Sequence, residues 1–203
     1  MKVKWLGHAS FLITAKDGTR IITDPYRPNP PSLAYKKINE SAEVVTVSHE
    51  HGDHNDVGSV GGKPQVIRGV GAHKAKNIEF KGVASYHDTA QGGQRGANTI
   101  FCFTVDGVRL CHVGDLGHTL SPQAVKDIGE VDVLLLNAGG GPTIGVPEAN
   151  EVLSVIKPRV AIPMHVKNDK CTFNRYTAED FVAGKSGVRR LNASECSSPT
   201  PSN

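Results

Sequence analysis

The stretch that most restricts how this chain can fold is VVTVSHEHGDHND, residues 44–56. It begins with a short apolar, β-branched run that is typical of a buried strand. It ends in a loop where His49, His51, Asp53 and His54 follow the spacing H-x-H-x-D-H. The strand would hold this loop at the edge of a rigid sheet, where a functional site needs its side chains.

The residue types in this loop indicate metal binding. Two His separated by one residue in an extended segment point the same way, so His49 and His51 can bind one metal ion. Asp53 and His54 then face a second position, and Gly52 lets the backbone turn sharply between the two pairs. The alternative is a solvated polar loop without a metal, which this spacing directly after a buried strand disfavours.

Length and charge exclude several classes of protein. A chain of 203 residues can bury one sizeable core, so we expect a single domain over 1–192 and a flexible Ser- and Pro-rich tail over 193–203. The formal net charge of +3 comes from scattered residues, which predicts no nucleic-acid partner. No stretch approaches the ~20 apolar residues of a membrane span, and MKVKWLGHASFLI lacks the unbroken apolar core of a signal peptide. We therefore expect a cytoplasmic protein.

The four cysteines lie far apart and form no C-x-x-C motif, so they are expected to be reduced thiols. They are Cys102, Cys111, Cys171 and Cys196. Cys102 and Cys111 flank an expected hairpin and could face each other across it, which leaves a disulfide between them as the alternative.

The pattern of apolar runs predicts two packed sheets with helices outside. Strands are expected in KVKWL, in the hairpin SFLITAKDGTRIITDP, in 44–47, and in PQVIRG, NIEFKGVASYH, TIFCFTV and VRLCHVG. Later strands, 131–138 and 159–164, are continuously apolar and are expected to be covered on both faces. They alternate with helices that begin near Ser121, in PEANEVLSVIKP and at Thr177. The fold class is therefore expected to be α/β.

Five short motifs resemble those of the metallo-β-lactamase superfamily. They are Asp24 in RIITDP, the stretch SHEHGDH, His87 in ASYH, Asp115 in CHVGDLG and His165 in AIPMH. The resemblance covers nearly the whole chain and implies the four-layer αββα sandwich of that superfamily. The segments WLGHASFLI, DPY, HVGDLG and KPRVAIPMH are most similar to a compact branch of metal-dependent hydrolases that includes ascorbate-phosphate lactonases. The stretch NAGGG differs from the Pro-Ile-Gly-Gly that is frequent in that branch, so the substrate preference does not transfer.

The resemblance also implies the residues of the site. One metal ion would be held by His49, His51 and His87, and a second by Asp53, His54 and His165, with Asp115 bridging the two. Asp24 would support the metal loop from outside. His8, in the turn LGHAS, would be either an outer donor to the site or a turn residue with structural hydrogen bonds. Ligands of nitrogen and oxygen favour two divalent ions, Zn²⁺ foremost, and also admit Mn²⁺ or Fe²⁺.

The expected activity is that of a dinuclear metal-dependent hydrolase. A hydroxide bridging two cations would cleave a small ester, lactone or phosphodiester, with Asp53 as the catalytic carboxylate that takes up a proton. The alternatives are a non-hydrolytic iron-dependent oxidoreductase on the same scaffold and a metal-binding protein without turnover. The expected partner is a small-molecule substrate, with no nucleic acid and no membrane. The oligomeric state stays open, a homo-oligomer included.

Four further polar residues have weaker assignments. His112 shares the strand of Asp115 and is expected to be either a buried structural residue or an outer donor to the site. His118 and His73 are expected to be solvated, although His118 could reach the mouth of the site. Arg95, in the glycine-rich stretch TAQGGQRGAN, is a candidate contact for an anion.

Overall fold

The computed structural model describes residues 1–191 and 195–197, and within them the strands form two six-stranded sheets. The first sheet has the order β12-β1-β2-β3-β4-β5 and the second β11-β10-β9-β8-β7-β6. The first consists of β12 (Glu195–Ser197), β1 (Lys2–Gly7), β2 (Ser10–Thr14), β3 (Arg20–Thr23), β4 (Val44–Val47) and β5 (Gln65–Arg68). The second consists of β11 (Val160–Met164), β10 (Val133–Asn137), β9 (Val108–His112), β8 (Ala97–Val105), β7 (Ile78–Tyr86) and β6 (Gly71–Ala75).

The main core lies between the two sheets. Phe11, Ile13 and Ile21 of the first sheet are buried in one cluster with Phe80 and Phe101 of the second. Side chains alternate between the faces of a strand, so Phe11 and Ile13 enter this cluster while Leu12, between them, is buried on the other face of the sheet. The two sheets therefore pack face to face, as the sequence led us to expect.

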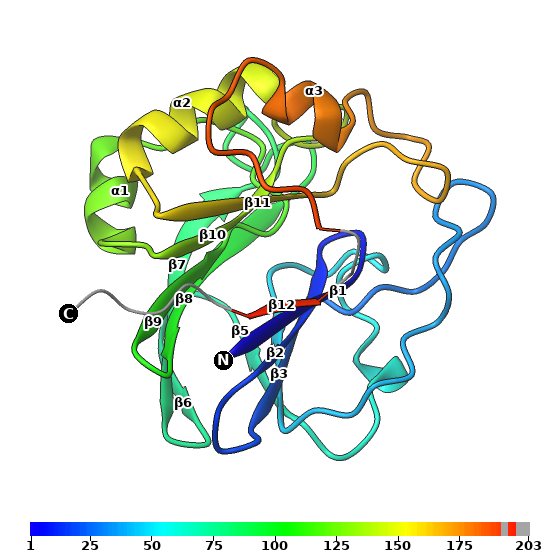
Figure 1. The fold of residues 1–203 in the computed structure, drawn as a ribbon, viewed down its shortest axis with the longest axis vertical. Helices are drawn as coiled ribbons and strands as arrows, with labels where there is room; N and C mark the ends of the chain where they lie inside the picture. The colour runs from blue at the N-terminus through cyan, green and yellow to red at the C-terminus, as the bar shows by residue number, and fades with distance from the viewer. Residues whose placement is uncertain (192–194, 198–203) are drawn as a thin grey trace.

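The α-helices cover the outer face of the second sheet (Figure 1). They are α1 (Pro122–Ile128), α2 (Val146–Ile156) and α3 (Ala178–Val182), and Ser121 and Thr177 accept capping hydrogen bonds as expected. Ala149, Val152 and Ile156 of α2 are buried on one face. The expected sandwich with outer helices is thus confirmed.

A loop takes the place of a helix over the outer face of the first sheet. Tyr26, Leu33, Tyr35 and Ile38, all from the segment between β3 and β4, are buried there against Ile22 and its neighbours. The Pro-rich sequence cannot continue a strand or a helix, so burial of its large side chains is what orders it. Within the described residues, the helical element near this layer is the short 3₁₀ helix η1 (Val57–Ser59).

Two expectations about individual elements were wrong. Within the described residues β11 pairs only with β10 and is partly exposed, so it is an edge strand rather than one covered on both faces. Pro163, which has no N–H to donate, fits an edge. The segment of His73, to which no secondary structure was assigned from the sequence, forms strand β6. Residues 195–197, expected in a flexible tail, form β12 and pair with β1, while 193–194 and 198–203 of that tail lie outside the described residues.

Strand directions gather the candidate residues at one edge of the sandwich. β1 and β3 are both antiparallel to β2, and β4 runs parallel to β3. In the second sheet β7 and β9 are both antiparallel to β8, and β10 and β11 run parallel to β9. The segments that follow β1, β3, β4, β7, β9 and β11 carry, respectively, His8, Asp24, the loop of His49 to His54, His87, Asp115 and His165. Each sheet therefore sends its candidate residues out from the carboxyl ends of strands that share one direction.

Candidate metal centre

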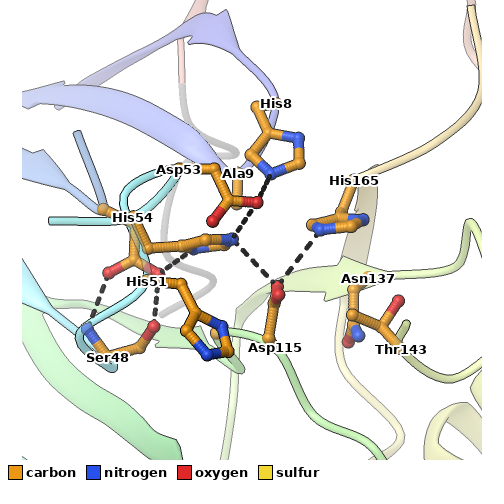
Figure 2. A network of polar contacts seen from close by, with 12 residues as sticks. His8, Ala9, Ser48, His51, Asp53, His54, Asp115, Asn137, Thr143 and His165 are labelled. Carbon is orange, nitrogen blue, oxygen red and sulfur yellow. Dashed lines mark hydrogen bonds and ion pairs between the residues drawn. The ribbon is translucent and has the colours of Figure 1, made fainter. Parts of the chain in front are cut away.

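Asp115 lies at the centre of the buried histidines. Its Oδ1 atom is 3.1 Å from Nε2 of His54 and 3.4 Å from Nε2 of His165. Its Oδ2 atom is 3.0 Å from Nε2 of His87 and 3.8 Å from Nε2 of His49. Figure 2 shows the carboxylate directed toward His54 and His165. The two oxygens of one carboxylate therefore face two different groups of histidines.

The side chains of those groups converge closely enough to share ions. The atoms that His49, His51 and His87 offer lie within 4.8 Å of one another. The same limit holds for a second group, His8, Asp53, His54 and His165, and for a third, Asp24, His49 and His54. The structure thus brings together the ligands that the sequence suggested for the site, and it places His8, expected as an outer donor, in the group around Asp53.

Asp24 supports the loop of His49 to His54 through hydrogen bonds. Its Oδ1 accepts a hydrogen bond of 2.8 Å from the backbone N–H of Ser48, and its Oδ2 accepts one from the Ser48 hydroxyl. Nδ1 of His54 lies 2.8 Å from Oδ2 of Asp24. With Nδ1 held by the carboxylate, Nε2 of His54 faces Asp115, so Asp24 orients the imidazole.

His8 orients the side chain of Asp53, as Asp24 orients that of His54. Its Nε2 lies 3.3 Å from Oδ2 of Asp53, and its Nδ1 lies 3.8 Å from Sγ of Cys171. Figure 2 marks the contact between His8 and Asp53. Burial, followed by the nearby His165, lowers the pKa of His8 to about 3, and burial raises the pKa of the Cys171 thiol to about 12. A neutral His8 that donates from Nε2 to the carboxylate must accept at Nδ1, and the protonated thiol of Cys171 is the donor there.

The electrostatics of the centre are those of buried carboxylates among imidazoles. Burial favours the protonated form of Asp115, but His165 and His54 outweigh it and hold the pKa of that carboxyl well below its usual value. Burial disfavours a charged His54, yet Asp115 and Asp24 raise the pKa of this imidazole well above its ordinary value. Burial also favours the protonated form of Asp53, but the hydrogen bond with His8 and the nearby His54 together outweigh it and lower the pKa of this carboxyl. In Asp24, likewise, burial is outweighed by His112 and His54, which lower the pKa of its carboxyl, so three ionised carboxylates meet in one small volume.

The donor atoms fit a cation. Among residues 1–191 and 195–197, no Lys or Arg forms an ion pair with Asp24, Asp53 or Asp115. Buried atoms that make no hydrogen bond include Nε2 of His54, both ring nitrogens of His165 and Oδ1 of Asp115. Leaving such groups unpaired is costly, and a divalent ion is the partner that would satisfy nitrogen and oxygen donors together.

Similarity to known proteins identifies the family of this chain. Residues 2–165 match the family model described as the beta-lactamase superfamily domain. The chain belongs to the metallo-β-lactamase superfamily. A UPF0173 metal-dependent hydrolase of Thermococcus kodakarensis is 30% identical over 195 residues, which cover 81% of this chain and 84% of that protein. A UPF0173 protein of Pyrococcus furiosus is 31% identical over 205 residues, covering 89% of both chains.

A solved structure agrees with this assignment. It is a candidate Zn-dependent hydrolase of the metallo-β-lactamase superfamily from Thermotoga maritima, 39% identical, with a TM-score of 0.75 over 92% of this chain and 86% of that one. The expected superfamily, its αββα fold and the class of metal-dependent hydrolase are thereby confirmed. None of the helices in the described residues is long and apolar enough to cross a membrane.

Several residues around this metallo-β-lactamase centre carry no signal in the sequence that we recognised. Asn98 on β8 accepts a 2.9 Å hydrogen bond at Oδ1 from the backbone N–H of Asp115 and donates to the Val113 carbonyl and the Ser85 hydroxyl. A Cβ on Gly114 would lie 2.3 Å from Oδ1 of Asn98, so this position admits only glycine. The backbone of Asp115 is therefore held by the strand beside it, a contact between distant residues that no short motif reveals.

Asp88, next to His87, organises the loop that follows β7. Its two carboxylate oxygens accept hydrogen bonds of 2.7–3.0 Å from four backbone N–H groups, those of Ala90, Gly92, Gln94 and Arg95. The sequence offers a signal here, since an Asp that precedes a glycine-rich stretch commonly accepts such bonds in a turn. The loop of Gly92 and Gly96 is thus anchored beside the ligand.

The structure shows the surroundings of the four residues with weaker assignments, His112, His118, His73 and Arg95. His112 is buried, with Nε2 donating 2.8 Å to the Ala9 carbonyl and Nδ1 accepting from the Gly114 N–H, and it also lies 4.0 Å from Asp24. His118 bonds the Thr119 carbonyl and the Tyr86 N–H, and His73 bonds the Gly69 carbonyl. All three are held by backbone groups rather than simply solvated. The Arg95 side chain is exposed, and its contact with an anion stays a prediction.

One exposed aromatic borders the centre. The Phe173 side chain is 38% exposed, and its ring lies edge-on to His165 and His8, with centroids 5.6 Å and 5.8 Å apart. Its neighbours are fixed: the Thr172 N–H donates to the Ser32 carbonyl, and Asn174 donates 2.9 Å to the His165 carbonyl. His51 is the exposed histidine of the cluster. The open side of the site is therefore bordered by an imidazole and a phenyl ring.

Proposed function

We propose that this protein is a dinuclear metal-dependent hydrolase of a small ester, lactone or phosphodiester. The observation that carries the proposal is the position of Asp115, whose two oxygens face two separate groups of histidines at 3.0–3.8 Å. A single ion would need only one such group. A carboxylate with one oxygen toward each group suits a bridge between two cations.

The ligands of the two ions are proposed from the same contacts. One ion would be held by His49, His51 and His87, and the other by Asp53, His54 and His165. When bound, two cations lower the pKa of a shared water toward neutrality and polarise the scissile carbonyl or phosphoryl oxygen. We propose Zn²⁺, and the donor set also admits Mn²⁺ or Fe²⁺ because it includes no thiolate.

Asp53 is the residue that we propose to handle the proton of the attacking water. Its side chain is 31% exposed, so it can meet both solvent and substrate. Oδ2 faces His8, and no hydrogen bond within the described residues uses Oδ1. His8 fixes the plane of the carboxylate, and Oδ1 is the atom that would accept the proton.

We propose that the Phe173 ring contacts an apolar part of the substrate. A rigidly held, exposed phenyl ring beside the ligands offers contact area at little cost in conformational entropy.

We further infer that residues 1–192 act as one catalytic unit, because both sheets contribute ligands. The free state of all four cysteines supports a cytoplasmic location for the enzyme.

Metal analysis combined with a substrate panel tests the proposal. The purified protein is depleted of metal, reconstituted with Zn²⁺, Mn²⁺ or Fe²⁺, and assayed on an aryl phosphodiester, a lactone and a β-lactam. We expect about two ions per chain and metal-dependent turnover of the phosphodiester or the lactone. A maximum of one ion per chain would contradict the dinuclear centre. Full occupancy without turnover of any compound would contradict the activity.

A further inference from the structure

Two cysteines face each other across neighbouring strands, away from the metal centre. Cys102 on β8 is paired directly with Cys111 on β9. Both side chains are free thiols, Cys111 fully buried and Cys102 partly exposed. The hairpin that joins the strands turns at Asp106 and Gly107, so Val105 and Val108 are its closing pair.

The register places the two cysteines in the closer kind of cross-strand pair. The two residues that flank a two-residue turn exchange hydrogen bonds, and hydrogen-bonded and non-hydrogen-bonded pairs then alternate along an antiparallel ladder. Counting back from Val105 and Val108, the pair Cys102 and Cys111 is non-hydrogen-bonded. In such pairs the Cα atoms are roughly 4.5 Å apart, just inside the range that a disulfide spans.

The surroundings of Cys102 differ from those of a buried structural thiol. Cys102 lines an open groove of about 1360 Å³ between α1 and the outer face of β6, β7 and β8, together with Lys81, Thr104 and Asp127. Lys81 is the residue paired with Cys102 on the other side, and its ammonium also contacts Asp127 of α1. The hydrogen bond from Cys111, and then the Lys81 cation, lower the pKa of the Cys102 thiol.

We propose that Cys102 and Cys111 form a reversible thiol–disulfide pair, in which Cys102 attacks low-molecular-weight disulfides that enter the groove and Cys111 resolves the product. The two cysteines take different roles because Cys102 lines the groove whereas Cys111 is buried. The short Cα separation also favours reversibility, since a bond formed near the limit of the allowed geometry is more readily reduced.

The chemistry is two successive exchanges. The Cys102 thiolate attacks one sulfur of the external disulfide, forms a mixed disulfide and releases one external thiolate, which takes up a proton. The Cys111 sulfur then attacks Sγ of Cys102 and displaces the second external thiolate, which takes up the proton that Cys111 loses. Two protein thiols are oxidised by two electrons, and one external disulfide is reduced to two thiols.

The cross-link would join the two strands that position Asp115. Asn98 lies on β8 and holds the backbone of Asp115, which follows β9. A bond between Cys102 and Cys111 ties these strands together four residues along the chain from Asn98 and from Asp115. Oxidation is therefore expected to stabilise the protein rather than to block the open side of the site.

Equilibration of the full-length protein in glutathione buffers tests the proposal. After each buffer, free thiols are alkylated and the protein is digested with trypsin, which cleaves after Arg95, Arg109 and Lys126 and so separates the two cysteines into peptides 96–109 and 110–126. We expect a linked pair of these peptides, an intact mass lower by two hydrogen atoms, and full reversal by excess reduced glutathione. The oxidised protein should have a midpoint of thermal unfolding higher by roughly 5 °C.

Matched variants separate the two roles. Cys111→Ser should accumulate a stable glutathione adduct on Cys102, and Cys102→Ser should give neither adduct nor link at position 111. Cys196→Ser, a partly exposed cysteine elsewhere, should form the link like the parent. Lys81→Gln should slow oxidation several-fold and Lys81→Arg should restore the rate. A parent protein that carries glutathione on Cys102 without forming the link, or that leaves Cys102 unmodified in oxidising buffer, would overturn the proposal.

Discussion

Nε2 of His54 lies 3.1 Å from Oδ1 of Asp115, although His54 follows a strand of the first sheet and Asp115 follows a strand of the second. The two atoms make no well-aligned hydrogen bond with each other and are buried. This contact joins the two halves of the sandwich at the centre of the site. Changes in either sheet are therefore expected to reach the same group of ligands.

Metal removal should destabilise the protein. An ion that binds only the folded state stabilises it by RT ln(1 + [L]/Kd), which is about 2.7 kcal/mol when the free ion exceeds Kd 100-fold. For a chain of this size we expect chelation to lower the midpoint of thermal unfolding by roughly 5–10 °C. Calorimetry with and without added Zn²⁺ measures this. An unchanged midpoint would show that the histidines are satisfied without an ion.

Asp115→Asn and Asp24→Asn should differ in how they respond to added metal. The amide at position 115 removes a negative charge that would lie between two cations, so we expect near-total loss of turnover even in excess metal. Asp24 acts through Ser48 and His54, and loss of such an outer partner typically costs 10- to 100-fold in metal affinity or activity. We expect partial rescue of Asp24→Asn by a metal titration.

Bound metal and turnover are measured together for both variants, with circular dichroism as a check of folding. Wild-type turnover in folded Asp115→Asn would remove this residue from its bridging role.

His8→Ala tests whether His8 orients Asp53 or binds metal itself. If it orients the carboxylate, turnover should fall 10- to 100-fold while the protein still binds two ions at saturation. Cys171→Ser, which keeps a donor toward Nδ1 of His8, should be close to the parent protein. Loss of one ion from His8→Ala, measured by elemental analysis, would instead make His8 a ligand.

Phe173→Ala should change substrate binding more than catalysis. The phenyl ring is exposed and edge-on to His8 and His165, so its removal takes away an apolar contact without removing a ligand. For an aryl phosphodiester we expect KM to rise about tenfold, which corresponds to ~1.4 kcal/mol, with kcat and metal content unchanged. Phe173→Leu should lose less. A fall in metal content with unchanged KM would mean that the ring only shields the histidines.

Asp132 should make stability depend on acid pH. The Arg109 backbone N–H and Nε donate to its Oδ2 at 2.8 Å and 2.9 Å, and these bonds lower the pKa of Asp132 to about 2. Because the unfolded value is about 3.9, the stabilisation is fully present above that pH and is lost as pH falls toward 2. In metal-free protein, the stability difference between the parent and Asp132→Asn should shrink as pH falls from 5 to about 2.5.

Glu130→Gln is the matched control, since Glu130 pairs with the same Arg109 but is 83% exposed, and an exposed pair contributes little. Denaturant unfolding at each pH gives the comparison. A difference for Asp132→Asn that stays constant with pH would show that the carboxylate is not the titrating partner.

Local features of the sequence determined the strands and the candidate ligands. The run of residues 44–47 forms β4 with the expected bounds, because four consecutive apolar or β-branched residues favour a buried strand wherever it lies. Spacing and residue type were likewise enough to suggest His49, His51, Asp53 and His54 as partners, since neighbours in an extended loop are close in any fold. The edge position of β11 was not visible in this way, because its apolar run resembles that of a central strand.

The tertiary structure decided which distant residues meet. The approach of Asp115 to His54 and His165, the hold of Asn98 on Asp115 and the contact of His8 with Asp53 all join segments far apart in the chain. The pairing of the strands and the packing of one sheet on the other bring these segments together, and neither is encoded in a short window. The same holds for Cys102 and Cys111, whose sequence allowed a facing pair but whose register in the β8–β9 ladder decided it. Contacts of this kind depend on the whole chain, because each one needs the ordered backbone of two strands before its side chains can meet.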